Sequence, residues 1–209
     1  IAILFIGFDW AARNIGRDRA LLATVIISSS LLFFGASAFV MTDMVMVLGT
    51  TLSMAGFHIC VCGTGSRRLW GNLFFVGLAI GLMAKGPVAV VLTGIPLFLW
   101  LLSGRRWRFL SRLPWATGLA LMAALTVPWY LAAEIKTPGF LRYFIIGEHF
   151  ERFVVPGWSG DLYGSAHTEP KGMIWLYALA AFLPWTVFFA ALMANGRQIF
   201  DQIRGDDQG

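Results

Sequence analysis

The chain has 209 residues, of which 58% are hydrophobic and 13% are charged, and its formal net charge at pH 7 is +5. Soluble domains carry about 25% charged residues, so this chain has too few polar groups to cover its own surface. Together with a mean hydropathy of +0.73, these values exclude an ordinary soluble domain and predict a polytopic membrane protein. Its 23 Gly, 8 Pro and 2 Cys also exclude collagen, a disordered chain and a disulfide scaffold.

The arginines predict the topology of this membrane protein. They gather in clusters separated by long apolar stretches: Arg13, Arg17 and Arg19; Arg67 and Arg68; Arg105, Arg106, Arg108 and Arg112; and Arg197 with Arg204. Loops rich in Lys and Arg stay on the cytoplasmic side, so we expect every cluster on the inner side of the membrane. The positive charge is therefore a topology signal and predicts no nucleic-acid partner.

Each apolar stretch between two clusters must leave the inner side and return to it. The stretch 69–102 would be about 51 Å long as a single helix, whereas a bilayer core is about 30 Å thick. It therefore turns at Lys85-Gly86-Pro87, where Gly and Pro break the helix. In chain order this reasoning predicts seven segments, the first of them partial: 1–12, 20–40, 44–62, 70–84, 87–103, 113–132 and 173–194.

The predicted fold class is an all-α, polytopic transmembrane helical bundle with an interfacial helix in its long outer loop. Residues 1–197 are expected to form the membrane domain, which is incomplete at its N-terminus because Ile1 already lies in an apolar run with no Met before it. Residues 198–209 are polar and charged, and are expected to form a cytoplasmic tail or connector.

Ionisable residues mark the outward ends of the three hairpins. Asp43 follows a stretch that has carried no charge since Arg19, and Lys85 lies between two apolar stretches. Because the segment from Gly71 to Ala84 covers only about 21 Å, we expect Lys85 to lie below the outer membrane surface. An ionisable group at that depth normally faces the interior of the protein or a water-filled cavity.

The third hairpin has a long outer loop, from about 134 to 171, in which aromatic and charged residues alternate over 138–153. This pattern suits a helix that lies in the plane of the membrane interface. The loop carries the other candidate site residues, namely Glu148, His149, Arg152 and His167.

These residues permit the handling of an anion beside an acid. Lys85 and Arg152 can hold phosphate oxygens, Lys as a point charge and Arg as a bidentate fork. Glu148, His149 and His167 could orient a substrate, and Glu148 with His149 could bind a divalent metal, the one cofactor that the pattern allows. Asp43 could accept a proton or orient Lys85.

Each of these residues also has an interpretation without function. Asp43 could cap the helix that begins near Met44, and Lys85 could be a turn residue whose amine reaches the interface. The segment 148–153 could be the solvated face of a surface helix. The metal site lacks the tight His and Cys spacing of known metal sites.

In their order and spacing, seven short motifs resemble those of the GT-C membrane glycosyltransferases. The resemblance is to the superfamily (family 39) of the protein O-mannosyltransferases and the bacterial 4-amino-4-deoxy-L-arabinose (lipid A) transferases. The motifs are Met41-Thr42-Asp43, Met83-Ala84-Lys85-Gly86-Pro87, Pro128-Trp129-Tyr130, Pro138-Gly139-Phe140, Glu148-His149-Phe150-Glu151-Arg152-Phe153, His167-Thr168-Glu169-Pro170 and Leu183-Pro184-Trp185.

The resemblance implies an enzyme of the bacterial inner membrane that transfers a sugar from a polyprenyl-phosphate donor to a lipid or protein acceptor on the periplasmic face. It implies that Lys85 and Arg152 contact the donor phosphate, and that Asp43 is a supporting acid. His149, with Glu148, would belong to a metal or donor head-group site. The aspartate that serves as the family's catalytic base lies in an outer loop that would precede Ile1, so we expect the chain by itself to be inactive.

Two other classes of protein stay open. A lipid or solute transporter or flippase would also need buried charges, but it would need broken helices and charges on both sides of the membrane midplane. A structural or assembly subunit would need no ionisable residues clustered at the hairpin ends.

Overall fold

The computed structural model describes residues 1–39, 41–63, 65–155, 170 and 172–195. Every regular element among these residues is helical, which confirms the predicted all-α class. The elements are α1 (Ala2–Ile15), α2 (Arg17–Ser29), α3 (Leu31–Ala38), α4 (Thr42–Cys62), α5 (Arg67–Lys85), α6 (Val88–Ser103), η1 (Trp107–Arg112), α7 (Trp115–Lys136), η2 (Arg142–Glu151), α8 (Arg152–Val154), α9 (Met173–Ala181) and α10 (Trp185–Ala194). The predicted tail, 198–209, lies outside the described residues.

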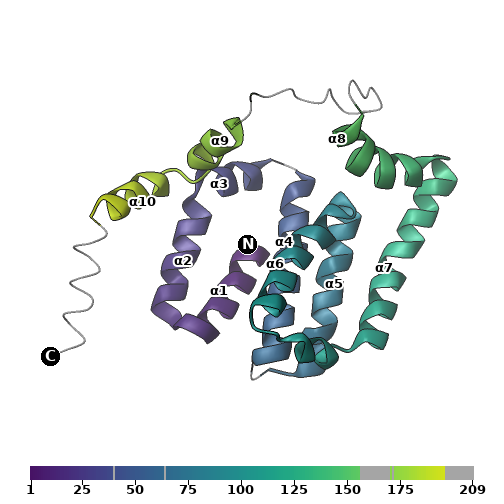
Figure 1. Cartoon of the computed structure of the whole chain (residues 1–209), viewed down its shortest axis with the longest axis horizontal. Coiled ribbons are helices and arrows are strands. Elements are labelled where there is room, and N and C mark those ends of the chain that lie inside the picture. The colour runs from purple at the N-terminus through teal and green to yellow at the C-terminus, as the bar shows by residue number, and fades with distance from the viewer. Residues whose placement is uncertain (40, 64, 156–169, 171, 196–209) are drawn as a thin grey trace.

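Helices α1, α2, α4, α5, α6 and α7 run up and down beside one another (Figure 1). The arginine-rich connections, α1–α2, α4–α5 and α6–α7, all lie at one end of this arrangement, which is the lower end in Figure 1. The α5–α6 turn and the end of α7 lie at the opposite end. This arrangement agrees with the hairpins that the arginine clusters predicted.

By length and composition, α4 and α7 could each cross a membrane, and each of two bent helix pairs in the described chain could form one further span. The apolar α6 is shorter, with 16 residues. Helix α5 has 19 residues and is about 28 Å long, because Arg67 and Arg68 belong to its first turn. The helix therefore extends beyond the predicted segment 70–84 at both of its ends.

The predicted segment 20–40 is divided into two helices that meet at a bend. Helices α2 and α3 meet at an angle of 62°, and the break falls at Ser30. The Oγ of Ser28 donates to Val25 O at 3.1 Å, and the Oγ of Ser30 donates to Ile27 O at 2.8 Å. Serine side chains that bond to the preceding turn compete with the helix and often bend it.

The last predicted span, 173–194, is bent as well. Helix α9 and residues 185–191 of α10 meet at 103°. Pro184 precedes α10 and has no N–H to continue the α9 hydrogen-bond ladder. The two breaks contact each other, since Leu31 N donates to Leu183 O at 2.8 Å and Trp185 Nε1 donates to Ser29 Oγ at 2.9 Å. Lipid offers no hydrogen-bond partners, so these two bonds satisfy polar groups that would otherwise be unpaired in a membrane.

Small residues bring α4 and α5 into close contact. A Cβ at Gly49 would lie 2.6 Å from Gly77 O, and the Oγ of Ser53, which is fully buried, donates to Phe74 O at 3.0 Å. This close approach of two backbones is the usual role of glycine in membrane helix pairs. Because α4 and α5 run in opposite directions, it places the first turn of α4 beside the last turn of α5.

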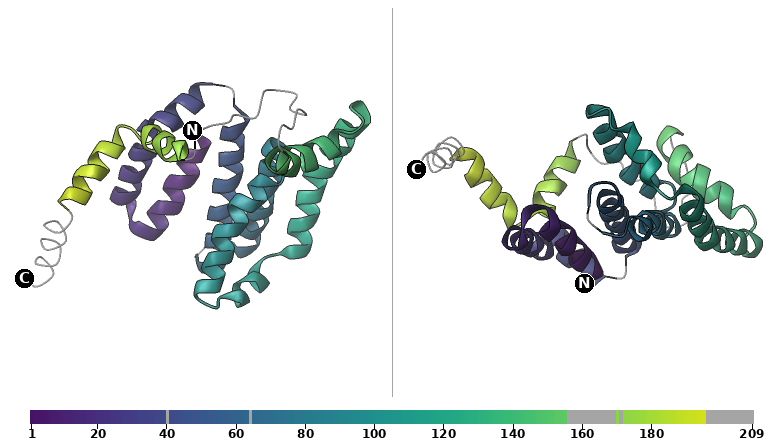
Figure 2. Two further views of the ribbon diagram at one scale, coloured as in Figure 1. Left: turned by 45° about the horizontal axis from the view of Figure 1, so that its top comes forward. Right: turned by 90° about the horizontal axis from the view of Figure 1, so that it is seen from below.

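A cluster of buried hydrophobic residues lies toward the arginine-rich end, where it joins α4, α5, α6 and the segment between η1 and α7 (Figure 1). Helix α7 and the α9–α10 pair lie on opposite sides of α4 and α5 (Figure 2). The buried members of the cluster are Phe57, Cys60, Val61, Phe74, Phe75, Leu101 and Leu113. The buried packing between the hairpins is thus concentrated at this end, whereas polar residues lie at the opposite end.

Candidate functional site

Asp43 and Lys85 form an ion pair at the end of the bundle opposite the arginines. Lys85 Nζ lies 3.1 Å from Asp43 Oδ1, and the two side chains are 38% and 48% exposed. Lys85 is the last residue of α5, and Asp43 lies in the first turn of α4. The prediction that Asp43 could orient Lys85 agrees with this geometry.

The alternative interpretation of Asp43 as a helix cap does not hold. Helix α4 begins at Thr42, so the residue in the capping position is Met41, and no side chain caps this helix. A carboxylate in the first turn still interacts favourably with the helix dipole. Asp43 is therefore stabilised both by the end of α4 and by the amine of Lys85.

The turn after Lys85 is formed by a glycine that no other residue could replace without strain. Gly86 has φ +69, and a Cβ there would lie 2.8 Å from Phe144 Cε1 and 3.1 Å from His149 Cε1. Both the backbone conformation and the space therefore require glycine. The contact also shows that η2, which is 58 to 63 residues further along the chain, packs directly on this turn.

The last carbonyl groups of α5 are bonded to side chains from other elements. The hydroxyl of Tyr130, in α7, donates to Leu82 O at 2.8 Å, and His149 Nε2, in η2, lies 3.2 Å from Lys85 O. Carbonyl groups in the last turn of a helix need partners from outside the regular ladder. Leu82 O also accepts from Gly86 N at 2.8 Å, so Tyr130 adds a second bond there, and together with His149 it holds the backbone that carries the Lys85 amine.

His149 is enclosed by backbone carbonyl groups. Its Nδ1 lies 2.8 Å from Phe144 O, while its Nε2 faces Lys85 O. A carbonyl oxygen only accepts a hydrogen bond, and a neutral imidazole donates from one nitrogen. The ring therefore donates to one of these carbonyls in its neutral form and to both when it is protonated.

Glu148 and Arg152 pair with each other across one turn. Arg152 Nη1 lies 3.0 Å from Glu148 Oε2, and the hydroxyl of Tyr143 donates to Glu148 Oε1. Both side chains are more buried than a solvated helix face would be, at 31% and 19% exposed for Arg152 and Glu148. The interpretation of this segment as a fully solvated face is therefore wrong.

The residues of this site do not fit the divalent metal that the sequence allowed at Glu148 and His149. Both carboxylate oxygens of Glu148 accept hydrogen bonds, and both ring nitrogens of His149 face carbonyl groups. In the described part of the chain, no three or more His, Cys, Asp or Glu residues are grouped so that they could hold a metal. His167, the other candidate, lies outside the described residues.

Helix η2 is a π-helix that runs across the end of α7, continuing into α8 (Figure 1). Its orientation agrees with the predicted interfacial helix. Two carboxylate oxygens of Glu134, in the last turn of α7, fix the intervening turn, because they accept hydrogen bonds from Gly139 N at 2.9 Å and Leu141 N at 2.8 Å. π-helices are rare and are frequent at functional sites.

Aromatic rings attach η2 to α7. The rings of Phe140 and Phe144 stack at 5.2 Å, and those of Tyr130 and Phe144 lie 6.1 Å apart. Trp129 contacts Phe140 at 5.7 Å, and Phe144 in turn meets His149 edge to face at 5.9 Å. The cluster thus links α7 and η2 to the turn that follows Lys85.

Tyr130 and Glu134 are the site residues that sequence reasoning did not single out. Tyr130 was quoted only as part of a motif, and its hydroxyl bonds to a carbonyl 48 residues away in the chain. Glu134 accepts from the N–H groups of Gly139 and Leu141, five and seven residues further on, a spacing for which the sequence offers no known motif.

Comparison with known proteins places this geometry in a family. The model of the dolichyl-phosphate-mannose-protein mannosyltransferase family matches residues 5–144, which is more than half of the chain. The match includes the Asp43–Lys85 pair and Tyr130, and it ends before Glu148, His149 and Arg152.

Curated relatives match over most of this chain. The undecaprenyl phosphate-alpha-4-amino-4-deoxy-L-arabinose arabinosyl transferase of Edwardsiella ictaluri is 28% identical over 195 residues, which are 90% of this chain and 33% of that protein. The protein of the same name from Yersinia pestis is 29% identical over the same shares of the two chains. The chain therefore spans about a third of the length of these relatives.

Solved structures share the fold. The crystal structure of ArnT from Cupriavidus metallidurans bound to undecaprenyl phosphate superposes with a TM-score of 0.74 at 24% identity, covering 94% of this chain and 35% of that one. The apo structure of the same protein gives a TM-score of 0.73 at 21% identity. With the family match, these findings confirm the predicted superfamily: the chain belongs to the dolichyl-phosphate-mannose-protein mannosyltransferase family of GT-C membrane glycosyltransferases.

Proposed function

We propose that the protein to which this chain belongs transfers a sugar from a polyprenyl-phosphate donor to an acceptor at the membrane face that carries Asp43 and Lys85. The observation that carries this proposal is the half-exposed Asp43–Lys85 ion pair, whose lysine ends a helix held by Tyr130 and His149. The family description and the relatives' names have a polyprenyl-phosphate sugar in common. The arginine-rich connections lie at the other end, and the tendency of such loops to stay in the cytoplasm supports a periplasmic position for this face.

In the proposed reaction, an acceptor oxygen forms a bond to the anomeric carbon while the bond from that carbon to the donor phosphate oxygen breaks. The acceptor's proton passes to a base outside this chain, and the electron pair of the broken bond stays on the phosphate. The amine of Lys85 stabilises the charge that grows on the phosphate, as preorganised cations do in transition states. Asp43 keeps this amine at the end of α5.

Arg152 is the second proposed phosphate ligand. In the structure it is oriented by Glu148, whose carboxylate holds one side of the guanidinium at 3.0 Å. The planar fork of an arginine can hold two phosphate oxygens at once. Glu148 and His149 are therefore proposed as positioning residues, Glu148 for Arg152 and His149 for the backbone of Lys85. His167 stays a prediction for the acceptor or head-group site.

The transporter alternative predicted one feature that the structure has. The α2–α3 and α9–α10 pairs are broken helices, as transporters often have. However, no Asp, Glu, Lys or Arg occurs within 44–66, 69–84, 87–104 or 113–133, so the long helices carry no charges near their centres. The charges lie at the two ends of the bundle, and the family match favours the transferase.

The substitution Lys85→Ala tests the proposed function in the full-length protein. Lys136→Ala is the matched control, because Lys136 is an exposed lysine in the last turn of α7, at the same end of the bundle. Binding of undecaprenyl phosphate is measured first, followed by transfer from undecaprenyl-phosphate 4-amino-4-deoxy-L-arabinose. We expect Lys85→Ala to lose roughly tenfold or more in binding, the effect of one charge-assisted hydrogen bond, and Lys136→Ala to behave as the wild type. Binding and transfer at wild-type levels by Lys85→Ala would contradict the proposal.

A further inference from the structure

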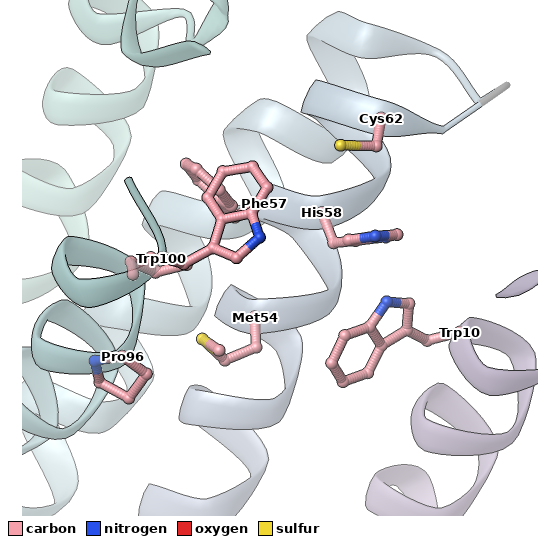
Figure 3. A pocket seen from close by; sticks show the side chains of 8 residues that line it. Trp10, Met54, Phe57, His58, Cys62, Pro96 and Trp100 are labelled. Atoms are coloured by element: carbon pink, nitrogen blue, oxygen red, sulfur yellow. The ribbon is translucent and has the colours of Figure 1, made fainter. Parts of the chain in front are cut away.

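A cavity lies away from the Asp43–Lys85 pair, between α1, α4 and α6 (Figure 3). Its volume is about 260 Å³. Trp10 reaches it from α1 on one side, and Trp100 reaches it from α6 on the other. The lining is almost wholly apolar and consists of Trp10, Met54, Phe57, His58, Cys62, Pro96, Leu97 and Trp100.

The cavity belongs to the arginine-rich end of the bundle. His58 and Cys62 lie in the last turns of α4, and Trp100 lies in the last turn of α6. Pockets for drug-sized ligands have volumes of about 300–1,000 Å³ and include several polar groups. A cavity of this size, with a mostly apolar surface between membrane helices, can take a single hydrocarbon chain.

A cation lies against one of the residues that line this cavity. The guanidinium of Arg106 is 4.6 Å from the centre of the Trp100 ring, which fixes the cation over a residue that lines the cavity. The ring is itself held in place, because it stacks on Phe109 at 5.6 Å and meets Phe57 edge to face at 6.0 Å. The position of Arg106 relative to the cavity is therefore set by packing.

Arg106 is exposed, and in the described part of the chain no carboxylate pairs with it. By contrast, Arg13, which follows Trp10 by one turn in α1, is already paired with Asp9 at 2.8 Å. The loop of Arg106 also carries Arg105 and Arg108, which are exposed too. An unpaired guanidinium with two basic neighbours is suited to bind a phosphate.

We propose that this cavity binds an anionic phospholipid from the membrane leaflet at the arginine-rich end. One acyl chain fills the cavity between α1, α4 and α6, and the phosphate binds to Arg106 at its rim. Basic pockets between membrane helices on the cytoplasmic side commonly take such head groups. The site lies at the opposite end of the bundle from Asp43 and Lys85 and does not depend on the transferase proposal.

The test measures which lipids stay bound to the full-length protein. The detergent-purified protein is titrated with dioleoyl phosphatidylglycerol or with dioleoyl phosphatidylcholine, and bound lipid is counted by native mass spectrometry. The acyl chains of the two lipids are identical, so any difference reports the head group. We expect one phosphatidylglycerol to be retained at concentrations at which phosphatidylcholine is not.

Two variants and one control separate the phosphate contact from general attraction. Arg106→Gln should weaken phosphatidylglycerol binding by roughly tenfold, the effect of one charge-assisted hydrogen bond. Arg68→Gln removes the same charge at the same end but from α5, which does not line the cavity, and should have little effect. Met54→Trp places an indole ring in the cavity and should abolish the phosphatidylglycerol adduct.

Three outcomes would overturn the proposal. Equal retention of the two lipids would show that the head group does not matter. Equal losses of phosphatidylglycerol binding in Arg106→Gln and Arg68→Gln would show that the lipid is attracted by the overall positive charge of this end and does not occupy a specific site. No adduct with either lipid in the wild type would show that another segment of the protein covers the cavity. Thermal unfolding of each variant without lipid checks that the variant folds.

Discussion

His149 Nε2 lies 3.2 Å from the carbonyl oxygen of Lys85. The helix that crosses the end of the bundle is thus attached to the backbone of the residue whose amine pairs with Asp43. Since Phe144 and His149 both contact Gly86, movement of η2 would move the α5–α6 turn with it. The position of the Lys85 amine therefore depends on the outer loop as well as on α5.

Gly86→Ala tests this attachment. The new Cβ would lie 2.8 Å from the Phe144 ring at a backbone φ of +69, so we expect a loss of stability of about 1–3 kcal/mol and weaker binding of undecaprenyl phosphate. Gly94→Ala is the control, because a Cβ there has no atom within 4 Å and Gly94 lies within α6. Alanine is favoured over glycine inside a helix, so thermal unfolding of the control should occur at the same temperature or higher. Equal behaviour of the two variants would contradict the attachment.

Tyr130→Phe removes the hydrogen bond to Leu82 O and leaves the ring contacts in place. We expect a small loss of stability, about 1 kcal/mol, and weaker binding of undecaprenyl phosphate because the end of α5 is held less firmly. The measurement is a double-mutant cycle in the full-length protein, in which Tyr130→Phe is combined with Lys85→Ala. If Tyr130 acts through Lys85, its effect on undecaprenyl phosphate binding should disappear in the Lys85→Ala background. The same loss in both backgrounds would indicate a general structural role.

Much of this arrangement could be predicted from the sequence. The arginine clusters predict which ends of the helices lie together, and so they place Asp43 and Lys85 at the same end of the bundle. The i, i+4 spacing of Glu148 and Arg152 is that of a helical ion pair, and the structure contains that pair. These features are local or follow from hydrophobic length, which a sequence displays directly.

Other parts could not be predicted in the same way. The bends at Ser30 and Pro184 lie at residues that can break a helix, but serine and proline also occur within membrane helices, so the sequence does not fix either bend or its angle. Helix α5 includes Arg67 and Arg68, which the charge rule placed in a loop. Tyr130 and His149 form hydrogen bonds to backbone carbonyl groups. Because every residue has a backbone carbonyl, the sequence does not indicate which residue the partner will be.

The ion pair between Asp43 and Lys85 predicts what the loss of the carboxylate charge would do. Asp43→Asn keeps the shape of the side chain but removes the charge opposite Lys85. Because both groups are substantially exposed, the pair contributes little to stability, within about 1 kcal/mol, so expression and thermal unfolding should be close to the wild type. Turnover should nevertheless fall, since the amine of Lys85 is no longer held in place. Unchanged turnover would show that Asp43 has no role in the site.

Close packing of α4 on α5 is what brings Asp43 and Lys85 together, and Gly77→Ala tests it. A Cβ at Gly77 would lie 2.5 Å from Gly49 O, a backbone atom that cannot move aside alone. The helices would have to separate, so we expect a loss of stability of about 1–3 kcal/mol and, in the protein that still folds, weaker undecaprenyl phosphate binding. Gly35→Ala is the control, because a Cβ there meets nothing within 4 Å. Thermal unfolding and lipid binding are measured on both variants in the full-length protein. If Gly77→Ala lowers the unfolding temperature yet binds undecaprenyl phosphate as the wild type does, the α4–α5 contact stabilises the fold without aligning the site.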